Sequence, residues 1–179
     1  MSSTAIIKAG FIFMLLSMST SVHAHNYRIS RRLMFEVAEN NLHIVGSIRV
    51  PSRHRKSLEF QAKGLEDLKR VLSKRLRYGV RLFQNNAPVS LLETKEKINT
   101  GRSNEEPIEL MLYKVVTLRP GDNVLRLELS KEAETISVDI IPGTRPAVLK
   151  KGPYVVKKKW TKKVKRGENL IWSYPSEKR

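Results

Sequence analysis

The chain has 179 residues, of which 34 are Lys or Arg and 17 are Asp or Glu, for a formal net charge of +17. It contains no cysteine, which excludes disulfides, thiolate metal sites and thiol nucleophiles, so an apolar core must supply its stability. So large an excess of positive charge favours polyanionic partners, although it would also serve solubility alone.

Residues 1–24 have the three parts of a cleavable secretory signal peptide. Lys8 supplies the positive charge, Ala9–Met18 forms the apolar segment, and Val22-His23-Ala24 offers small residues at the positions that a signal peptidase reads. The apolar run is about half the length of roughly 20 residues that a membrane-spanning helix needs. The sequence therefore predicts a periplasmic or secreted protein whose mature chain begins at His25 and contains no transmembrane helix.

Residues 25–148 are patterned as a domain of short strands. Alternating apolar residues predict a hairpin over 32–50, which Pro51 ends and a basic loop at 52–56 follows. The same pattern predicts further strands within 80–92, 108–117, 124–129 and 135–141. The polar segment 94–107 is expected to be a long surface loop. These short strands, separated by turn signals, predict an immunoglobulin-like antiparallel β-sandwich.

One amphipathic helix is predicted within this sandwich, over residues 64–78. Its apolar residues recur on one face of a 3.6-residue period, acidic residues occupy its first turn, and Gly79 is placed to end it. We expect its cationic face to be solvated; a contribution to polyanion binding is the alternative.

Several of these segments, in this order, resemble the extracytoplasmic N-terminal domain of the hydrogenase and urease accessory family of nickel or cobalt transporters. The matching pieces are Ala24-His25, the first hairpin, the helix 65–76 running into Tyr78-Gly79-Val80-Arg81-Leu82, and Asn85-Asn86-Ala87-Pro88-Val89. The resemblance covers roughly residues 24–93. The membrane bundle of that family has no counterpart in this sequence. The resemblance therefore implies a related soluble module, and it transfers neither transport activity nor a metal ligand.

Residues 149–179 form a basic, aromatic-containing segment, predicted to be a tail or a terminal hairpin turning at 166–169. Lysines interleaved with Tyr154, Trp160, Trp172 and Tyr174 suit an anionic interface, where charge attracts and aromatic rings settle at the head-group level. The alternative is that the lysines are only the solvated face of the hairpin. The predicted polyanion-binding residues are Lys150, Lys151, Lys157, Lys158, Lys159, Trp160, Lys162, Lys163, Lys165 and Arg166.

A metal site is the second possibility that the sequence raises. After cleavage, His25 would offer an α-amino group and an imidazole, a nitrogen pair that suits Cu(II). A second imidazole would come from His43 or His54. The sequence contains no recognised catalytic motif, which predicts a protein that is not an enzyme. A hydrolase whose site is assembled from distant residues stays an alternative.

Together these features predict an exported, non-enzymatic binding or accessory protein of the cell envelope. Its expected partner is an anionic envelope surface or an envelope protein, and the compartment disfavours nucleic acid. No cofactor is expected, with copper as the alternative. The alternative functions are a periplasmic copper- or nickel-handling protein and a hydrolase.

Overall fold

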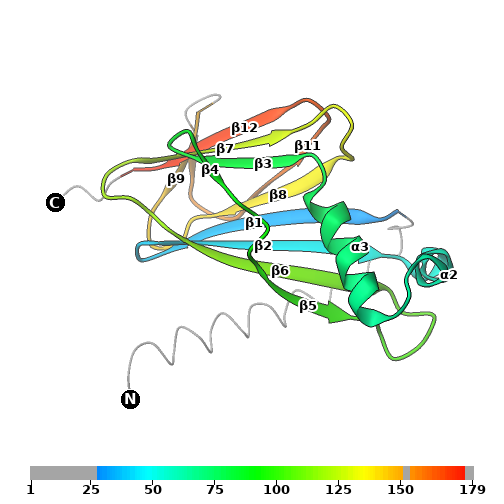
Figure 1. The fold of residues 1–179 in the computed structure, drawn as a ribbon. Coiled ribbons are helices and arrows are strands. Elements are labelled where there is room, and N and C mark those ends of the chain that lie inside the picture. Colours follow the sequence, from blue (N-terminus) through cyan, green and yellow to red (C-terminus); the bar gives the residue numbers. More distant parts are fainter. Residues whose placement is uncertain (1–27, 151–153, 176–179) are drawn as a thin grey trace, which may run out of the picture.

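The computed structural model describes residues 28–150 and 154–175 (Figure 1). The predicted signal peptide, His25 and Lys151 lie outside the described residues. Within the described residues, no helix is long and apolar enough to cross a membrane.

The described residues form two six-stranded sheets, which we call sheet A and sheet B (Figure 1). In spatial order, sheet A contains β11 (Trp160–Val164), β8 (Ile136–Ile141), β1 (Ser30–Ala38), β2 (Asn41–Val50), β6 (Ile108–Thr117) and β5 (Lys95–Asn99). Sheet B contains β10 (Tyr154–Val156), β9 (Ala147–Leu149), β12 (Asn169–Tyr174), β7 (Asn123–Leu129), β3 (Val80–Gln84) and β4 (Ala87–Val89). Among these pairs β1 and β8 run parallel and the others antiparallel. The predicted, mainly antiparallel β-sandwich is confirmed.

The main core lies between the two sheets, where the inward residues of each strand meet. Phe35 of β1 packs against Trp172 of β12, with ring centroids 4.9 Å apart, and both side chains are fully buried. The period of two in the predicted first hairpin therefore marks the buried face correctly. The Asn85-Asn86 turn between β3 and β4 is also where the sequence predicts it, with both residues at positive φ.

Helix α3 (Leu65–Arg77) packs against sheet A. It covers the part of the sheet formed by the end of β2 and the start of β6. Its Leu68, Leu72 and Leu76 pack on the inner face formed by Ile48 and Leu110. Arg31 of β1 holds the helix in place, because its buried guanidinium donates hydrogen bonds to the carbonyl oxygens of Leu76 (2.8 Å), Tyr78 (2.7 Å) and Glu134 (3.0 Å). The last carbonyls of the helix thereby gain a partner.

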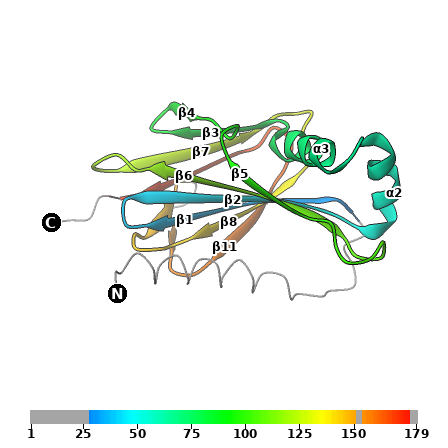
Figure 2. The same cartoon turned by 60° about the horizontal axis from the view of Figure 1, so that its bottom comes forward.

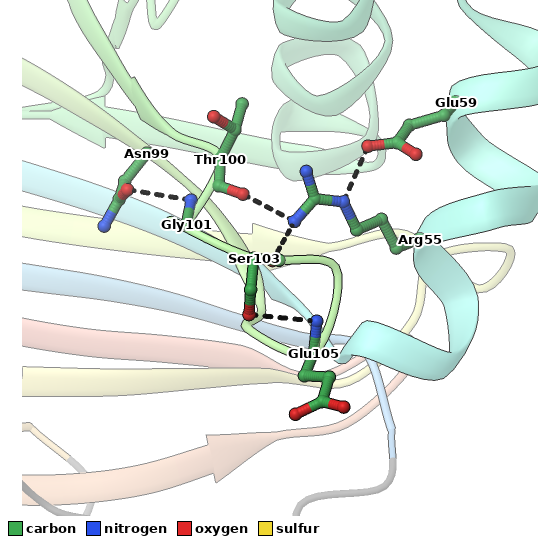
Figure 3. Close-up of polar contacts among 7 residues, drawn as sticks. All are labelled: Arg55, Glu59, Asn99, Thr100, Gly101, Ser103 and Glu105. Carbon is green, nitrogen blue, oxygen red and sulfur yellow. Dashed lines mark hydrogen bonds and ion pairs between the residues drawn. The ribbon is translucent and has the colours of Figure 1, made fainter.

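The predicted basic loop at 52–56 is wrong, because these residues begin a second helix, α2 (Ser52–Gln61). The helix has little apolar periodicity, but its Leu58 is buried in the core cluster beneath α3, and polar contacts also tie the helix to the fold. Arg55 bonds Glu59 at 2.6 Å and donates to the carbonyl oxygens of Thr100 and Ser103, each at 2.7 Å (Figure 3). These hydrogen bonds connect α2 to the loop that contains Thr100 and Ser103, which is part of the predicted 94–107 surface loop. The first part of that predicted loop is instead β5, an edge strand paired with β6.

The basic segment after residue 149 is part of the sandwich and forms neither a tail nor a terminal hairpin. β11 pairs with β8 at the edge of sheet A, whereas β12 lies between β9 and β7 inside sheet B. Trp172 and Tyr174, expected at an anionic interface, are fully buried in the core. Their burial follows from the place of β12 inside sheet B, where its inward side chains face the core between the two sheets.

Candidate functional site

The candidate site is one side of the sandwich. It contains β10, the edge strand of sheet B, and β11, the edge strand of sheet A, which follow one another in the sequence. Lys157, Lys158 and Lys159 carry the chain from sheet B across to sheet A. Figure 2 shows β11 at the rim of sheet A, beyond β8. We call the cations along this side the basic edge: Lys150, Lys157, Lys158, Lys159, Lys162, Lys163, Lys165 and Arg166.

The alternation of β11 sets which of its side chains face outward. Trp160 and Val164 lie opposite the buried Ile140 and Ile136, so they share the inner face. Trp160 is half-buried and packs against the main core, so at least part of its ring is engaged in packing. Lys163 lies on the outer face. Lysines on an edge strand also prevent pairing with another chain, which is the structural explanation for part of this charge.

Asp139 of β8 anchors the basic edge to the rest of sheet A. Its carboxylate is fully buried, and its Oδ2 lies 3.2 Å from Nε of Arg32 and 3.1 Å from Nζ of Lys159. The Thr161 hydroxyl donates to Oδ1 at 2.7 Å. One carboxylate therefore joins β1, β11 and the sheet-to-sheet connection. It neutralises one of two cations, so the cluster stays positive and Arg32 adds to the basic edge.

Most cations of the basic edge have no acidic partner, unlike those of α3. Four of the five cations of α3 form ion pairs, namely Lys69–Glu66, Arg70–Asp67, Arg75–Glu134 and Arg77–Glu96. In the basic edge, Lys159 pairs with Asp139, and Lys162 lies 3.8 Å from Glu168. No carboxylate of the described residues forms an ion pair with its other members, all exposed: Lys150, Lys157, Lys158, Lys163, Lys165 and Arg166. Six exposed cations without a carboxylate partner therefore lie along this one side of the molecule.

The two predicted metal ligands within the described residues, His43 and His54, are not brought together. His43 lies on the outer face of sheet A, with Nδ1 2.7 Å from the Tyr113 hydroxyl and Glu36 directly opposite. Burial lowers the pKa of His43 and raises that of Glu36, so both neutral forms are favoured. His54 lies on α2, past the other end of β2, which at about 3.3 Å per residue puts it roughly 20 Å or more away. Residues 28–150 and 154–175 contain no cluster of three or more potential metal ligands.

Two members of the site were missed by sequence reasoning, Arg32 and Asp139. Asp139 is the one acid in the apolar strand of residues 135–141, and that isolated charge was the available signal. Nothing in the local pattern indicated which cations it would meet, because Arg32 and Lys159 lie far from it in the sequence.

Comparisons with protein-family models, with curated proteins and with solved structures find no match to this chain. The fold and the site define a mainly antiparallel β-sandwich with a cationic edge. The resemblance to a transporter domain stays a prediction, and function has to be argued from the residues themselves.

Proposed function

We propose that this protein is an exported, non-enzymatic binding protein that engages an anionic surface of the cell envelope through its basic edge. The observation that carries the proposal is the row of exposed cations at 150, 157, 158, 163, 165 and 166, none ion-paired with a carboxylate of the described residues. The predicted signal peptide supports the compartment.

The expected strength follows from the number of free cations. A Lys or Arg near an anionic membrane contributes about 1 kcal/mol, and the effect decays within a Debye length of about 10 Å at 0.1 M salt. Six such residues along one edge could act together on a surface, whereas scattered cations could not. Binding should therefore be strong at low salt and weaken steeply as salt is added.

The test compares two variants with the same change in net charge. The edge variant carries Lys157→Gln, Lys158→Gln, Lys163→Gln and Lys165→Gln. The control carries Lys56→Gln, Lys63→Gln, Lys74→Gln and Lys95→Gln, all exposed lysines elsewhere on the molecule. Sedimentation with vesicles of phosphatidylglycerol and phosphatidylcholine measures binding at low salt.

We expect the edge variant to lose up to about 1,000-fold in affinity at low salt and the control to lose much less, because only the first set lies on one edge. Equal losses would show that net charge alone drives binding, and the proposal would be wrong. Unfolding midpoints of both variants check that the fold is intact.

A further inference from the structure

The outer face of sheet B carries an unusual share of the exposed apolar surface. Eight large apolar side chains are exposed among the described residues, and four of them belong to this face or to its β10 edge. These four, between 36% and 56% exposed, are Val124, Ile171, Val155 and Tyr154.

The register of the strands places three of these side chains, Val124, Ile171 and Val155, in one patch. One row of paired residues crosses the sheet, formed by Val155 of β10, Val148 of β9, Ser173 of β12 and Val124 of β7. Ile171 is two residues from Ser173 on β12, so it projects from the same face. Tyr154 lies opposite the buried Leu149, so it projects from the other face of β10. The patch therefore spans four strands, with the buried Ser173 between Val148 and Val124.

Charge around this patch is one-sided. Lys150, Lys157 and Lys158 are exposed at its β9–β10 border. Glu128 is the one acidic residue within the strands of sheet B, and it pairs with Arg126 at 3.2 Å. The described helices α2 and α3 pack against strands of sheet A, so neither of them covers the outer face of sheet B (Figure 1). The patch thus combines exposed apolar side chains on β10, β12 and β7 with cations at its β9–β10 border.

We propose that the outer face of sheet B and the basic edge together form a docking surface for an anionic phospholipid bilayer. This inference rests on the proposed function and names its ligand. A soluble polyanion offers only charge, whereas a bilayer interface offers phosphates beside an apolar boundary. Lys150, Lys157 and Lys158 contact head-group phosphates. Val124, Val155 and Ile171 lie against the acyl boundary.

The test separates apolar from electrostatic contacts by using two probes with the exported protein. The patch variant carries Val124→Thr, Val155→Thr and Ile171→Thr, which keep the β-branched shape that suits exposed strands. Its control carries Leu65→Gln, Leu92→Gln and Val115→Thr, three exposed apolar residues outside the patch. The probes are phosphatidylglycerol–phosphatidylcholine vesicles and soluble polyphosphate.

We expect the patch variant to lose about tenfold or more in vesicle affinity, to keep its polyphosphate affinity, and to lose the salt-resistant part of vesicle binding. The edge variant should lose affinity for both the vesicles and the polyphosphate, and the apolar control should keep its affinity for both. If the patch variant binds vesicles as the unmodified protein does while the edge variant does not, the bilayer inference is overturned and the proposed function stands. If the edge variant also binds normally, the proposed function fails.

A second copy of the chain is the other apolar partner that this face could take. Sedimentation equilibrium distinguishes it: a dimer that the patch substitutions dissociate, with vesicle binding unchanged, would assign the face to self-association and overturn the bilayer proposal.

Discussion

Asp139 is a fully buried carboxylate whose two cationic partners are both partly exposed, and this asymmetry predicts which substitutions will destabilise the protein. The Arg32 and Lys159 side chains are 44% and 42% exposed, whereas that of Asp139 is 0% exposed. Removing the carboxylate leaves two cations that can turn toward water. Removing the cations leaves a buried negative charge without compensation.

The two changes should therefore differ in size. Asp139→Asn keeps the shape of the side chain and an acceptor for Thr161, and we expect a loss of about 1–2 kcal/mol in the free energy of unfolding. The double variant Arg32→Gln and Lys159→Gln should lose about 3–5 kcal/mol, the typical cost of stranding a buried charge. Adding Asp139→Asn to that double variant should recover part of the loss.

Urea denaturation at neutral pH measures all three variants, and Arg75→Gln, which breaks a partly exposed pair with Glu134, serves as a control with a loss of about 0.5 kcal/mol. Vesicle binding gives a second readout: Asp139→Asn removes one negative charge from the site, so affinity at low salt should rise by up to about fivefold. If Asp139→Asn is more destabilising than the double variant, the carboxylate is not the desolvated partner and the reasoning is refuted.

Three further substitutions and one deletion test other contacts of the fold. At Gly143, a Cβ would lie 1.6 Å from the carbonyl oxygen of Val37, a backbone atom that cannot move aside. Gly143→Ala should therefore lose about 3 kcal/mol or more in chemical denaturation, and a loss below about 1 kcal/mol would contradict this contact. Arg31→Met removes the donor that three carbonyl oxygens near the end of α3 share, so amide exchange in the last turn of α3 should accelerate. Unchanged exchange there would show that packing alone holds the helix. Burial raises the pKa of Tyr174, so the folded protein keeps its phenol protonated where the unfolded chain ionises. Stability should then fall as pH rises above about 10, and Tyr174→Phe should reduce that fall in alkaline unfolding curves. Deleting residues 150–179 removes a strand from inside sheet B together with Trp172, so we expect a chain that is unfolded by circular dichroism and rapidly proteolysed. A folded truncated chain would disprove this placement.

The sequence by itself determined the features that depend on local periodicity and turn chemistry. Neighbouring residues were enough to predict four features: the buried face of the first hairpin, the apolar face of α3, the end of that helix at Gly79 and the Asn85-Asn86 turn. In each case the signal lies within a short stretch of sequence: apolar residues that repeat every 2 or 3.6 residues, or a residue that tolerates positive φ. The β-sandwich was predicted for the same reason.

The tertiary structure alone decided which strands pair, and this determined the site. The two apolar residues of β11, Trp160 and Val164, share their inward face with Lys162, so the local pattern is that of a solvated tail, and only pairing with β8 makes it an edge strand. The place of β12 inside sheet B depends on residues more than 40 positions earlier in the chain. Asp139 likewise meets Arg32 and Lys159 only because three strands lie side by side. Pairing between distant segments leaves no local periodicity to detect, which is why the charges were evident in the sequence and their arrangement along one edge was not.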